Sequence, residues 1–587
     1  MDGSPAMPPP PRPLRWHGAW LAALFAAAFL VRAAVIVESA RSPYHEHLVL
    51  DAGTYHQIAT RGDPAGPFWQ PPGYPWFLRA VYRAFGRDDP ALARWVQALF
   101  GAAACLSIAA AGSRLGRPRA GLAAGWAAAF YGPLVYFDNE ILPASPGVLL
   151  AALIVLLLSG RVPPGTGQVL AAGAVLGAGG VLLPPLAVPG ALLAAWLARR
   201  SGWRRAALFL LVAAVPVVAV AWRNARYGEG FIPVSYNGGI NFWIGNNPDY
   251  PSTVAIRPGM AWNELTEQPR CRGGARTRAA ESAWFYRQGL RFATRRPLSW
   301  LGIVAWKTAA TLSVREIGRN RDIYDAREES AVMRALLLPW GFPFVLLGPL
   351  AAAGTAALVR RRTLPAPPAL MAAGVLAACV LFFPTARYRA PALPALLLLA
   401  ALGLPAVRAR DLPAAAVVLG LGFVPPGIPP IPRAETSYNI GMSLSTAGRP
   451  RAALAFYEEA LERDPGHADA HWARAAALAK LGRDEEARAE LLRTLELDPG
   501  ASLAWQALGA YHRRQGNLEA ARACLARAVA ADPCNRVARA LLAHALLDLG
   551  LYRAARRELD EARRIYPRRD RSLEEAERRY RRLTGAR

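Results

Sequence analysis

An acidic residue follows the first apolar run of the sequence and is the first side chain that could do chemistry. Asp51 comes soon after that run, and Tyr55 stands four residues further on. A carboxylate at a membrane–water boundary can act as a base toward an acceptor hydroxyl, or it can hold a metal ion. The ordinary alternative for a single aspartate is a solvated loop charge, so the neighbouring residues must decide between the two.

Aromatic and proline residues fill the segment after Asp51, which reads FWQPPGYPWFLRAVYRAFG from Phe68 onward. This composition is typical of a helix at a membrane interface, where amphipathic rings lie. Tyr55 and Tyr74 are therefore candidates for contact with a substrate.

A second pair of acids, Asp138 and Glu140, lies in the segment YFDNEILPA between two apolar runs. With Asp51 they are grouped as candidate catalytic residues on the resemblance given below, which implies that they could orient an acceptor or share a metal ion with Asp51. The alternative is that they are charges at the end of a helix.

Three arginines, Arg223, Arg387 and Arg389, stand at predicted outer edges of apolar runs. A guanidinium group can bind two phosphate oxygens at once, so these residues are candidates for a phosphate site. Each could instead extend to lipid headgroups. Arg32, inside the first run, is a weaker candidate.

Asparagines accompany glycines and aromatic rings in the segment NGGINFWIGNN, which supplies Asn237, Asn241 and Asn246. Amide groups beside an apolar face suit the hydroxyls of a sugar, although a plain polar loop has the same composition. The segment lacks the glycine spacing of a dinucleotide-binding loop or a Walker motif.

Apolar segments must position these residues, since 53% of the sequence is hydrophobic and the long apolar runs end near residue 428. About 20 apolar helical residues cross a bilayer. We therefore predict an all-α, polytopic membrane bundle over residues 17–430. Its eleven candidate spans lie near residues 17–38, 93–112, 120–137, 146–160, 167–183, 184–198, 206–222, 333–358, 365–384, 390–407 and 411–428.

Charge predicts how the bundle is oriented. The net charge is +27, and most of the excess precedes residue 434 as arginine clusters between apolar runs. This distribution indicates cytoplasmic loops, including a proline-rich tail at 1–16, and argues against nucleic acid as a partner. The loops 39–92 and 223–332 then lie outside, provided that the apolar segment 298–312 is an interfacial helix and does not cross.

Residues 434–587 contain a repeat. Gly448, Gly482, Gly516 and Gly550 are spaced by 34 residues, and alanine and proline series have the same period. This period is typical of tetratricopeptide hairpins, in which glycine and alanine are expected to let the two helices pack closely. We predict an α-solenoid of four repeats plus a capping helix at 571–585, on the outer side. Within the solenoid, a disulfide between Cys524 and Cys534 is the pairing to consider. Two free thiols are the favoured interpretation.

Several segments in order resemble one enzyme family. D-x-x-x-Y from Asp51, QPPGYP from Gln70, YGPLVYFDNEILPA at 131–144 and ARYRAPALP at 386–394 resemble the C-type polyprenol-dependent glycosyltransferases. The resemblance is to family 39, which includes protein O-mannosyltransferases and aminoarabinose transferases, and it spans about residues 40–400.

The resemblance implies a cavity toward the outer leaflet of a bacterial inner membrane. It also implies a polyprenyl-phosphate sugar as donor and an inverting transfer. By position, Asp51 matches the first-loop acid taken as catalytic, and Asp138 and Glu140 match the second-loop acids. Family members differ in metal dependence, so a divalent ion (Mg²⁺ or Mn²⁺) stays open as a cofactor. The repeats would recruit a protein partner or acceptor.

Two other functions remain as alternatives. A transporter or flippase of a lipid-linked saccharide would need similar edge arginines, but also charges within several spans and related halves. A membrane-anchored scaffold would leave the work to the repeats, yet eleven spans exceed what an anchor needs.

Overall fold

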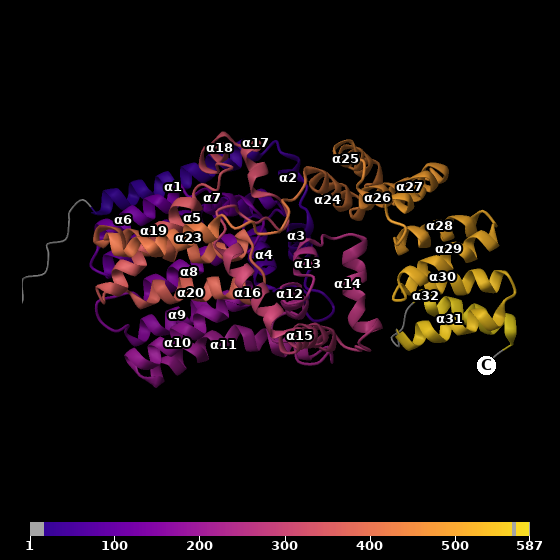
Figure 1. The fold of residues 1–587 in the computed structure, drawn as a ribbon, viewed down its shortest axis with the longest axis horizontal. Helices are drawn as coiled ribbons and strands as arrows, with labels where there is room; N and C mark the ends of the chain where they lie inside the picture. Colours follow the sequence, from indigo (N-terminus) through magenta and orange to yellow (C-terminus); the bar gives the residue numbers. More distant parts are fainter. Residues whose placement is uncertain (1–16, 566–570, 586–587) are drawn as a thin grey trace, which may run out of the picture.

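A computed structural model describes residues 17–565 and 571–585; the predicted tail at 1–16 lies outside the described residues. Within these ranges the structure contains helices and no β-strand, and the only β-bridge pairs Leu338 with Phe342. The all-α prediction is therefore confirmed. Figure 1 shows a bundle of long helices and, at one end of it, a curved array of shorter ones.

The bundle contains helices that are long and apolar enough to cross a membrane. Among the described residues, four helices meet both conditions, and a fifth span arises if two helices joined at a 55° bend count as one. They are Gly18–Ser39 in α1, Pro90–Arg114 (α5), Trp203–Ala225 (α11), the run Ala386–Ala406 (α21 to η4), and the bent pair α6 and α7 (Pro118–Ala129 and Gly132–Asn139).

Shorter apolar helices complete the bundle. They are α8 (Ala144–Leu158), α9 (Thr166–Leu182), α10 (Ala187–Ser201), α19 (Phe344–Arg360), α20 (Ala366–Leu381) and α23 (Leu412–Gly422). Every one of the eleven predicted segments thus contains a helix. The number of spans stays a prediction, because several of these helices are shorter than a bilayer requires.

The predicted span 333–358 is interrupted. Helix α18 (Ala331–Leu336) ends before a turn that contains Gly341, with φ 93°, and the cis Phe342–Pro343 peptide bond. A proline lacks the amide hydrogen that a continuing helix would donate, so α19 begins only at Phe344.

Small residues allow the bundle helices to approach one another. A Cβ atom on Gly112 of α5 would lie 2.3 Å from the Cα atom of Gly121 of α6. Close backbone approach at small residues is the usual way in which membrane helices associate.

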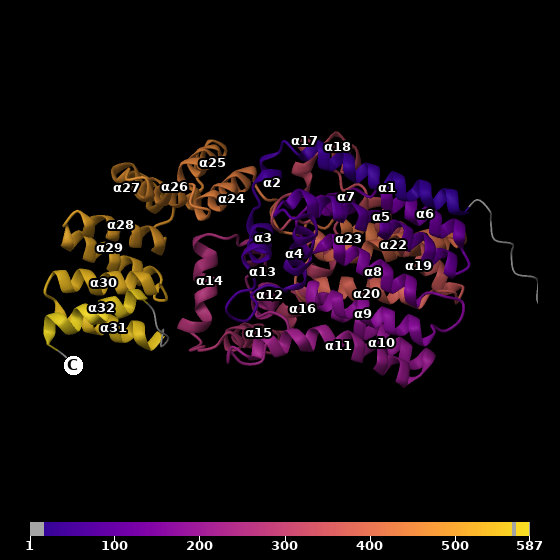
Figure 2. The same cartoon turned by 180° about the vertical axis from the view of Figure 1, so that it is seen from behind.

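Both long loops fold into helices at one end of the bundle, next to the array, as both views show (Figures 1 and 2). The loop 39–92 contains α2 (Pro43–Glu46), α3 (Leu50–Arg61) and α4 (Gly73–Phe85). The loop 223–332 contains α12 (Gly238–Ile244), α13 (Tyr250–Ala255), α14 (Met260–Cys271), α15 (Arg278–Arg295), α16 (Pro297–Thr311), η2 (Ile323–Asp325) and α17 (Ala326–Glu329).

The array consists of helical pairs, as the repeat predicts. Its helices are α24 (Arg433–Thr446), α25 (Pro450–Arg463), α26 (Ala468–Lys480), α27 (Asp484–Leu497), α28 (Ser502–Arg514), α29 (Leu518–Ala531), α30 (Arg536–Asp548), α31 (Tyr552–Ile565) and the capping α32 (Arg571–Thr584). The repeated alanines are buried between paired helices, as expected.

The repeated glycines have a different role from the one expected. Gly448, Gly482, Gly516 and Gly550 all have φ between 72° and 79°, and an added Cβ atom would meet nothing within 4 Å. They end the first helix of each pair in the left-handed conformation that favours glycine. The 34-residue spacing of these glycines therefore marks the turn between the two helices of each pair, and not a close packing contact.

A disulfide joins the array to the second long loop. Cys534, between α29 and α30, bonds to Cys271 at the end of α14, whereas Cys524 is a buried free thiol. The Cys524–Cys534 pairing considered from the sequence is therefore not formed.

Candidate active site

The main cavity lies where the two loops meet the bundle, and its volume is about 480 Å³. One part is lined by charged and amide side chains from α3, the 256–258 and 319–320 segments, and α21. The other part is lined by apolar residues of the α9–α10 junction, Leu182 to Val188, and by Val375, Ala378 and Leu381 of α20. The cavity wall therefore has a polar part, called the polar end below, and an apolar part, called the apolar end.

Asp51 is held at the polar end by three partners. Its carboxylate accepts hydrogen bonds from Arg387 Nη1 at 2.5 Å, Gln70 Nε2 at 2.6 Å and Asn320 Nδ2 at 3.3 Å. Burial alone would raise the pKa of Asp51, but the charge of Arg387 and the hydrogen bonds outweigh burial and lower it. Asp51 is therefore ionised at neutral pH.

The start of α3 fixes the direction of Asp51. Leu50, the first residue of the helix, has a φ of 52°, a conformation that costs a side-chain-bearing residue roughly 1–3 kcal/mol. Asp51 follows in the first helical turn, where the partial positive charge of the helix N-terminus favours a carboxylate.

Three arginines line the same part of the cavity: Arg257, Arg319 and Arg387. Burial and the charges of Arg257 and Arg387 lower the pKa of Arg319 to about 9, which still leaves it protonated at neutral pH. Within the described residues, Arg387 Nε is buried and has no hydrogen-bond partner. With one acid facing three arginines, the polar end carries excess positive charge and suits an anion.

Other predicted residues also line the cavity. Tyr55, Asn237 and Asn241 do so, beside the rings of Trp69 and Tyr286. The structure thus brings five of the predicted residues to one place, since Asp51 and Arg387 are there as well.

Asp138 does not line this cavity. It is buried inside the bundle, where it accepts a hydrogen bond from Arg32 Nε at 2.6 Å and another from the Ser145 hydroxyl. Arg32 also donates to the backbone oxygens of Ala28 and Ala129. Asp138 and Arg32 therefore join α7 to α1, and the structure does not bring Asp138 together with Asp51 as the sequence grouping expected.

Glu140 and Tyr74 lie behind the cavity wall. Glu140 borders a small gap of about 30 Å³ and is 3.9 Å from Arg321 Nη1. Tyr74 is fully buried and donates to Gln97 Oε1 at 2.6 Å. Neither residue lines the main cavity.

The remaining predicted residues hold backbone in place. Arg223 donates to the oxygens of Pro64 and Gly66, and Arg389 pairs with Glu316 at 2.6 Å. The Asn246 amide donates to the oxygens of Phe242 and Leu381. None of the three lines the main cavity, because these partners direct the side chains elsewhere.

The predicted metal set is dispersed. Asp51, Asp138 and Glu140 have separate partners, and the part of the chain that the structure describes holds no cluster of three or more His, Cys, Asp or Glu side chains with metal-binding geometry.

Sequence reasoning missed Gln70, Arg257, Arg319 and Asn320. All four come from loop segments, and three of them, Arg257, Arg319 and Asn320, lie outside any recognisable motif. Gln70 stands in the QPPGYP segment, so the resemblance could have indicated it. Arg257 and Arg319 are distinguished only by the fold, which brings two distant parts of the second loop together.

A second cavity of about 320 Å³ adjoins the first, and the two share Trp69 and Trp262. Its walls combine Tyr236 and Phe285 with charged residues of α14 and α15. Arg278 lies over the Tyr236 ring at 5.3 Å and contacts Glu281 at 3.1 Å.

Comparison with known proteins identifies the array. A tetratricopeptide repeat family model matches residues 444–511 and 512–579. The C-terminal part is a tetratricopeptide array. A comparison of the whole chain with curated proteins finds no match.

Among solved structures, the chain is similar to ArnT from Cupriavidus metallidurans bound to undecaprenyl phosphate. The identity is 16%, the match covers 86% of this chain and 80% of that one, and the TM-score is 0.38. It is also similar to MamA from Desulfovibrio magneticus RS-1, with 20% identity, 26% and 94% coverage and a TM-score of 0.23. The family model bears out the repeats that the 34-residue period predicted.

Proposed function

We propose that the chain is a membrane glycosyltransferase that moves a sugar from a polyprenyl phosphate to an acceptor at the outer face of the membrane. The observation that carries the proposal is the composition of the main cavity. An apolar end beside α9, α10 and α20 suits a polyprenyl chain, and the arginine-lined end suits its phosphate. Asp51 lies at the same polar end, next to where the sugar would be attached.

The arginines would bind the donor and stabilise the leaving group. Arg257, Arg319 and Arg387 can each donate to phosphate oxygens, and charge-assisted bonds of this kind are strong. Negative charge grows on the phosphate as its bond to the sugar breaks. Donors already in place for that charge lower the barrier.

Asp51 would orient and deprotonate the acceptor hydroxyl. In a single displacement, the acceptor oxygen bonds to the anomeric carbon while the bond from that carbon to the phosphate oxygen breaks. The bonding electrons leave with the phosphate, the hydroxyl proton passes to Asp51, and the anomeric centre inverts. A bound phosphate competes for Arg387 and adds negative charge, so it raises the pKa of Asp51 when a base is needed.

The acceptor would reach the site through the second cavity. Aromatic faces beside arginine and glutamate groups suit a hydroxyl-rich ligand, and Trp69 and Trp262 border both cavities. The repeats beyond this region would recruit a protein partner or a protein acceptor.

The disulfide supports one assignment of the membrane side. Disulfides persist in oxidising compartments, so the Cys271–Cys534 bond supports an outer, periplasmic position for both the second loop and the array in a bacterial inner membrane.

The test is to incubate the purified protein with defined polyprenyl-phosphate sugars and an acceptor panel, and to measure release of polyprenyl phosphate. We expect release that requires an acceptor and is lost in Asp51→Asn. A transporter would move the lipid-linked saccharide across vesicle membranes without releasing polyprenyl phosphate, and that result would reject the transferase.

A further inference from the structure

We infer that the first two tetratricopeptide repeats are part of the donor site, with Ser443 and Asp469 as positioning residues for the two loop segments that carry Asp51 and Arg257. The inference rests on the proposed function for the identity of the ligand. It differs from a recruiting role, because the surface in question is already occupied by this chain's own loops.

The first contact holds the segment that carries Arg257. Asp469, near the start of α26, accepts a hydrogen bond from the Met260 amide at 2.9 Å. A Cβ atom on Gly259 would lie 2.8 Å from the same carboxylate, so loop and carboxylate fit closely. Tyr438 of α24 donates to the Pro258 oxygen at 3.4 Å. Both partners lie within three residues of Arg257.

The second contact holds the segment that carries Asp51. Ser443 of α24 donates to the Leu48 oxygen at 2.9 Å. Tyr44, Val49 and Met260 pack against the apolar core of the first repeats, and His47 meets the edge of the Phe456 ring at 5.8 Å. The strained Leu50, which directs Asp51, is thus buttressed from the array side.

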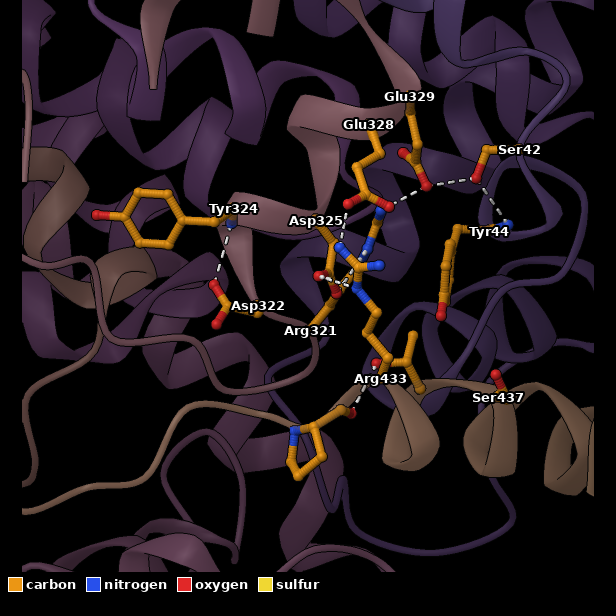
Figure 3. A network of polar contacts seen from close by, with 12 residues as sticks. Ser42, Tyr44, Arg321, Asp322, Tyr324, Asp325, Glu328, Glu329, Arg433 and Ser437 are labelled. Carbon is orange, nitrogen blue, oxygen red and sulfur yellow. Dashed lines mark hydrogen bonds and ion pairs between the residues drawn. The ribbon is translucent and has the colours of Figure 1, made fainter. Parts of the chain in front are cut away.

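A third contact joins the array to both loops, as Figure 3 shows. Arg433, the first residue of α24, pairs with Glu328 and lies 3.7 Å from Asp325. Beside this pair, Arg321 bonds to Glu329 and lies 4.0 Å over the Tyr44 ring. The start of the array therefore sits on a network that also connects the first loop to the second.

Charge links the array directly to the cavity. Burial lowers the pKa of Arg257, and Glu435 of α24 is the nearby charge that opposes this effect. Glu435 itself is fixed by His467 at 3.2 Å and by Asn439 at 3.2 Å. The array thus supplies both the backbone anchor and the counter-charge for one of the three cavity arginines.

The experiment uses full-length protein in detergent and measures binding of polyprenyl phosphate through the change in intrinsic tryptophan fluorescence, together with KM and kcat for a donor that the wild type uses. We expect Asp469→Ala to weaken binding and raise the donor KM about five- to tenfold, the loss of roughly one hydrogen bond. Asp469→Asn keeps an oxygen that accepts from Met260, so it should stay within about twofold of wild type.

Two further variants frame the result. Ser443→Ala, a milder change, should raise the donor KM about threefold. Asp484→Asn is the matched control, because Asp484 pairs only within the array, with Arg514. Unchanged donor binding in a folded Asp469→Ala protein would overturn the inference and leave a recruiting role for the array.

Hydrogen exchange separates this inference from the proposed function. Asp469→Ala should speed exchange in peptides covering residues 48–51 and 256–260 without any ligand present. Unchanged protection there overturns the positioning role even if the wild type proves not to be a transferase. If the wild type neither binds polyprenyl phosphate nor transfers sugar, the proposed function is rejected. Faster exchange in Asp469→Ala than in the wild type would still support the positioning role of the array.

Discussion

At the scale of single residues, two aspartates that the sequence grouped together have opposite surroundings. Asp51 lines a cavity with partners on one side and space on the other, whereas Asp138 is enclosed by Arg32 and Ser145 inside the bundle. The first arrangement leaves a carboxylate available to a ligand. The second arrangement pairs the Asp138 carboxylate with Arg32 and Ser145, and so holds helices together.

Replacing Asp51 by Asn should abolish transfer without unfolding the protein. The amide keeps the size of the carboxylate but cannot take a proton from the acceptor, so we expect a loss of about 100-fold or more in kcat. Transfer assays and size-exclusion profiles measure the two effects. Asp63→Asn is the control, since this acid of the same loop pairs with Arg79, accepts a hydrogen bond from Trp76 Nε1 and does not line the main cavity. Normal turnover in Asp51→Asn would disprove the catalytic role.

Replacing Asp138 by Asn should instead reduce stability. Removing one partner leaves Arg32 buried and uncompensated, and breaking a buried pair in this way costs about 3–5 kcal/mol. Thermal denaturation in detergent measures the loss. The double change Arg32→Leu with Asp138→Leu removes both charges and should recover much of it. If the single variant melts like wild type, the pair is not structural.

The sequence could predict Asp51 and Arg387, because both stand in segments that resemble family motifs. It could not predict Arg257 or Arg319, since their proximity depends on how the second loop folds around α13. It also could not separate Asp51 from Asp138, because residue type and spacing do not reveal which acid has a buried counter-charge.

At the scale of elements, helix α16 depends on one buried cation. Lys307 donates to the oxygens of Gly245 and Phe382 at 2.8 and 3.3 Å and to Asn246 Oδ1 at 3.2 Å. These groups end α12 and α20, so a single ammonium group joins three helices. The helical and apolar character of α16 was readable from sequence, but its fixation by Lys307 was not.

Replacing Lys307 by Met should loosen this junction. The methionine fills the same space but leaves three buried oxygens without that donor, at a cost of about 1–3 kcal/mol for each acceptor left unsatisfied. A lower melting temperature and faster hydrogen exchange in α12 are the expected results. Thr308→Ala is the control on the same helix, because Thr308 bonds only to the Val304 oxygen in its own helix. Equal melting of the two variants would contradict this role.

At the scale of the whole molecule, the repeat array and the membrane bundle are covalently connected in two ways, through the chain at residues 424–432 and through the Cys271–Cys534 bond. The repeat period alone predicted the array and its capping helix, because each hairpin reuses one local pattern. The attachment of the array to the loops was not predictable. The residues of the first two repeats that contact the loops do not interrupt the repeat pattern, so the sequence gives no sign of these contacts.

The Cys271–Cys534 disulfide can be tested with a protease site inserted at residues 425–430. After cleavage, the array should remain bound to the membrane fragment in denaturing gels without reductant and separate when a reductant is added. Cys534→Ser should separate under both conditions, while Cys524→Ser should behave as wild type because Cys524 is a free thiol. Separation of the wild type without reductant would rule out the bond.

The disulfide also has a consequence for the order of biosynthesis. Its cysteines are 263 residues apart, and Cys534 lies in the loop before the fourth repeat. The N-terminal half, with Asp51 and the second loop, therefore leaves the ribosome long before the partner cysteine exists. Because domains form as they are synthesised, the cavity must wait for the array before its walls are braced. A translation product truncated before Cys534 would keep the contacts of Arg433, Ser443 and Asp469 but would lack this bond between the array and the second loop.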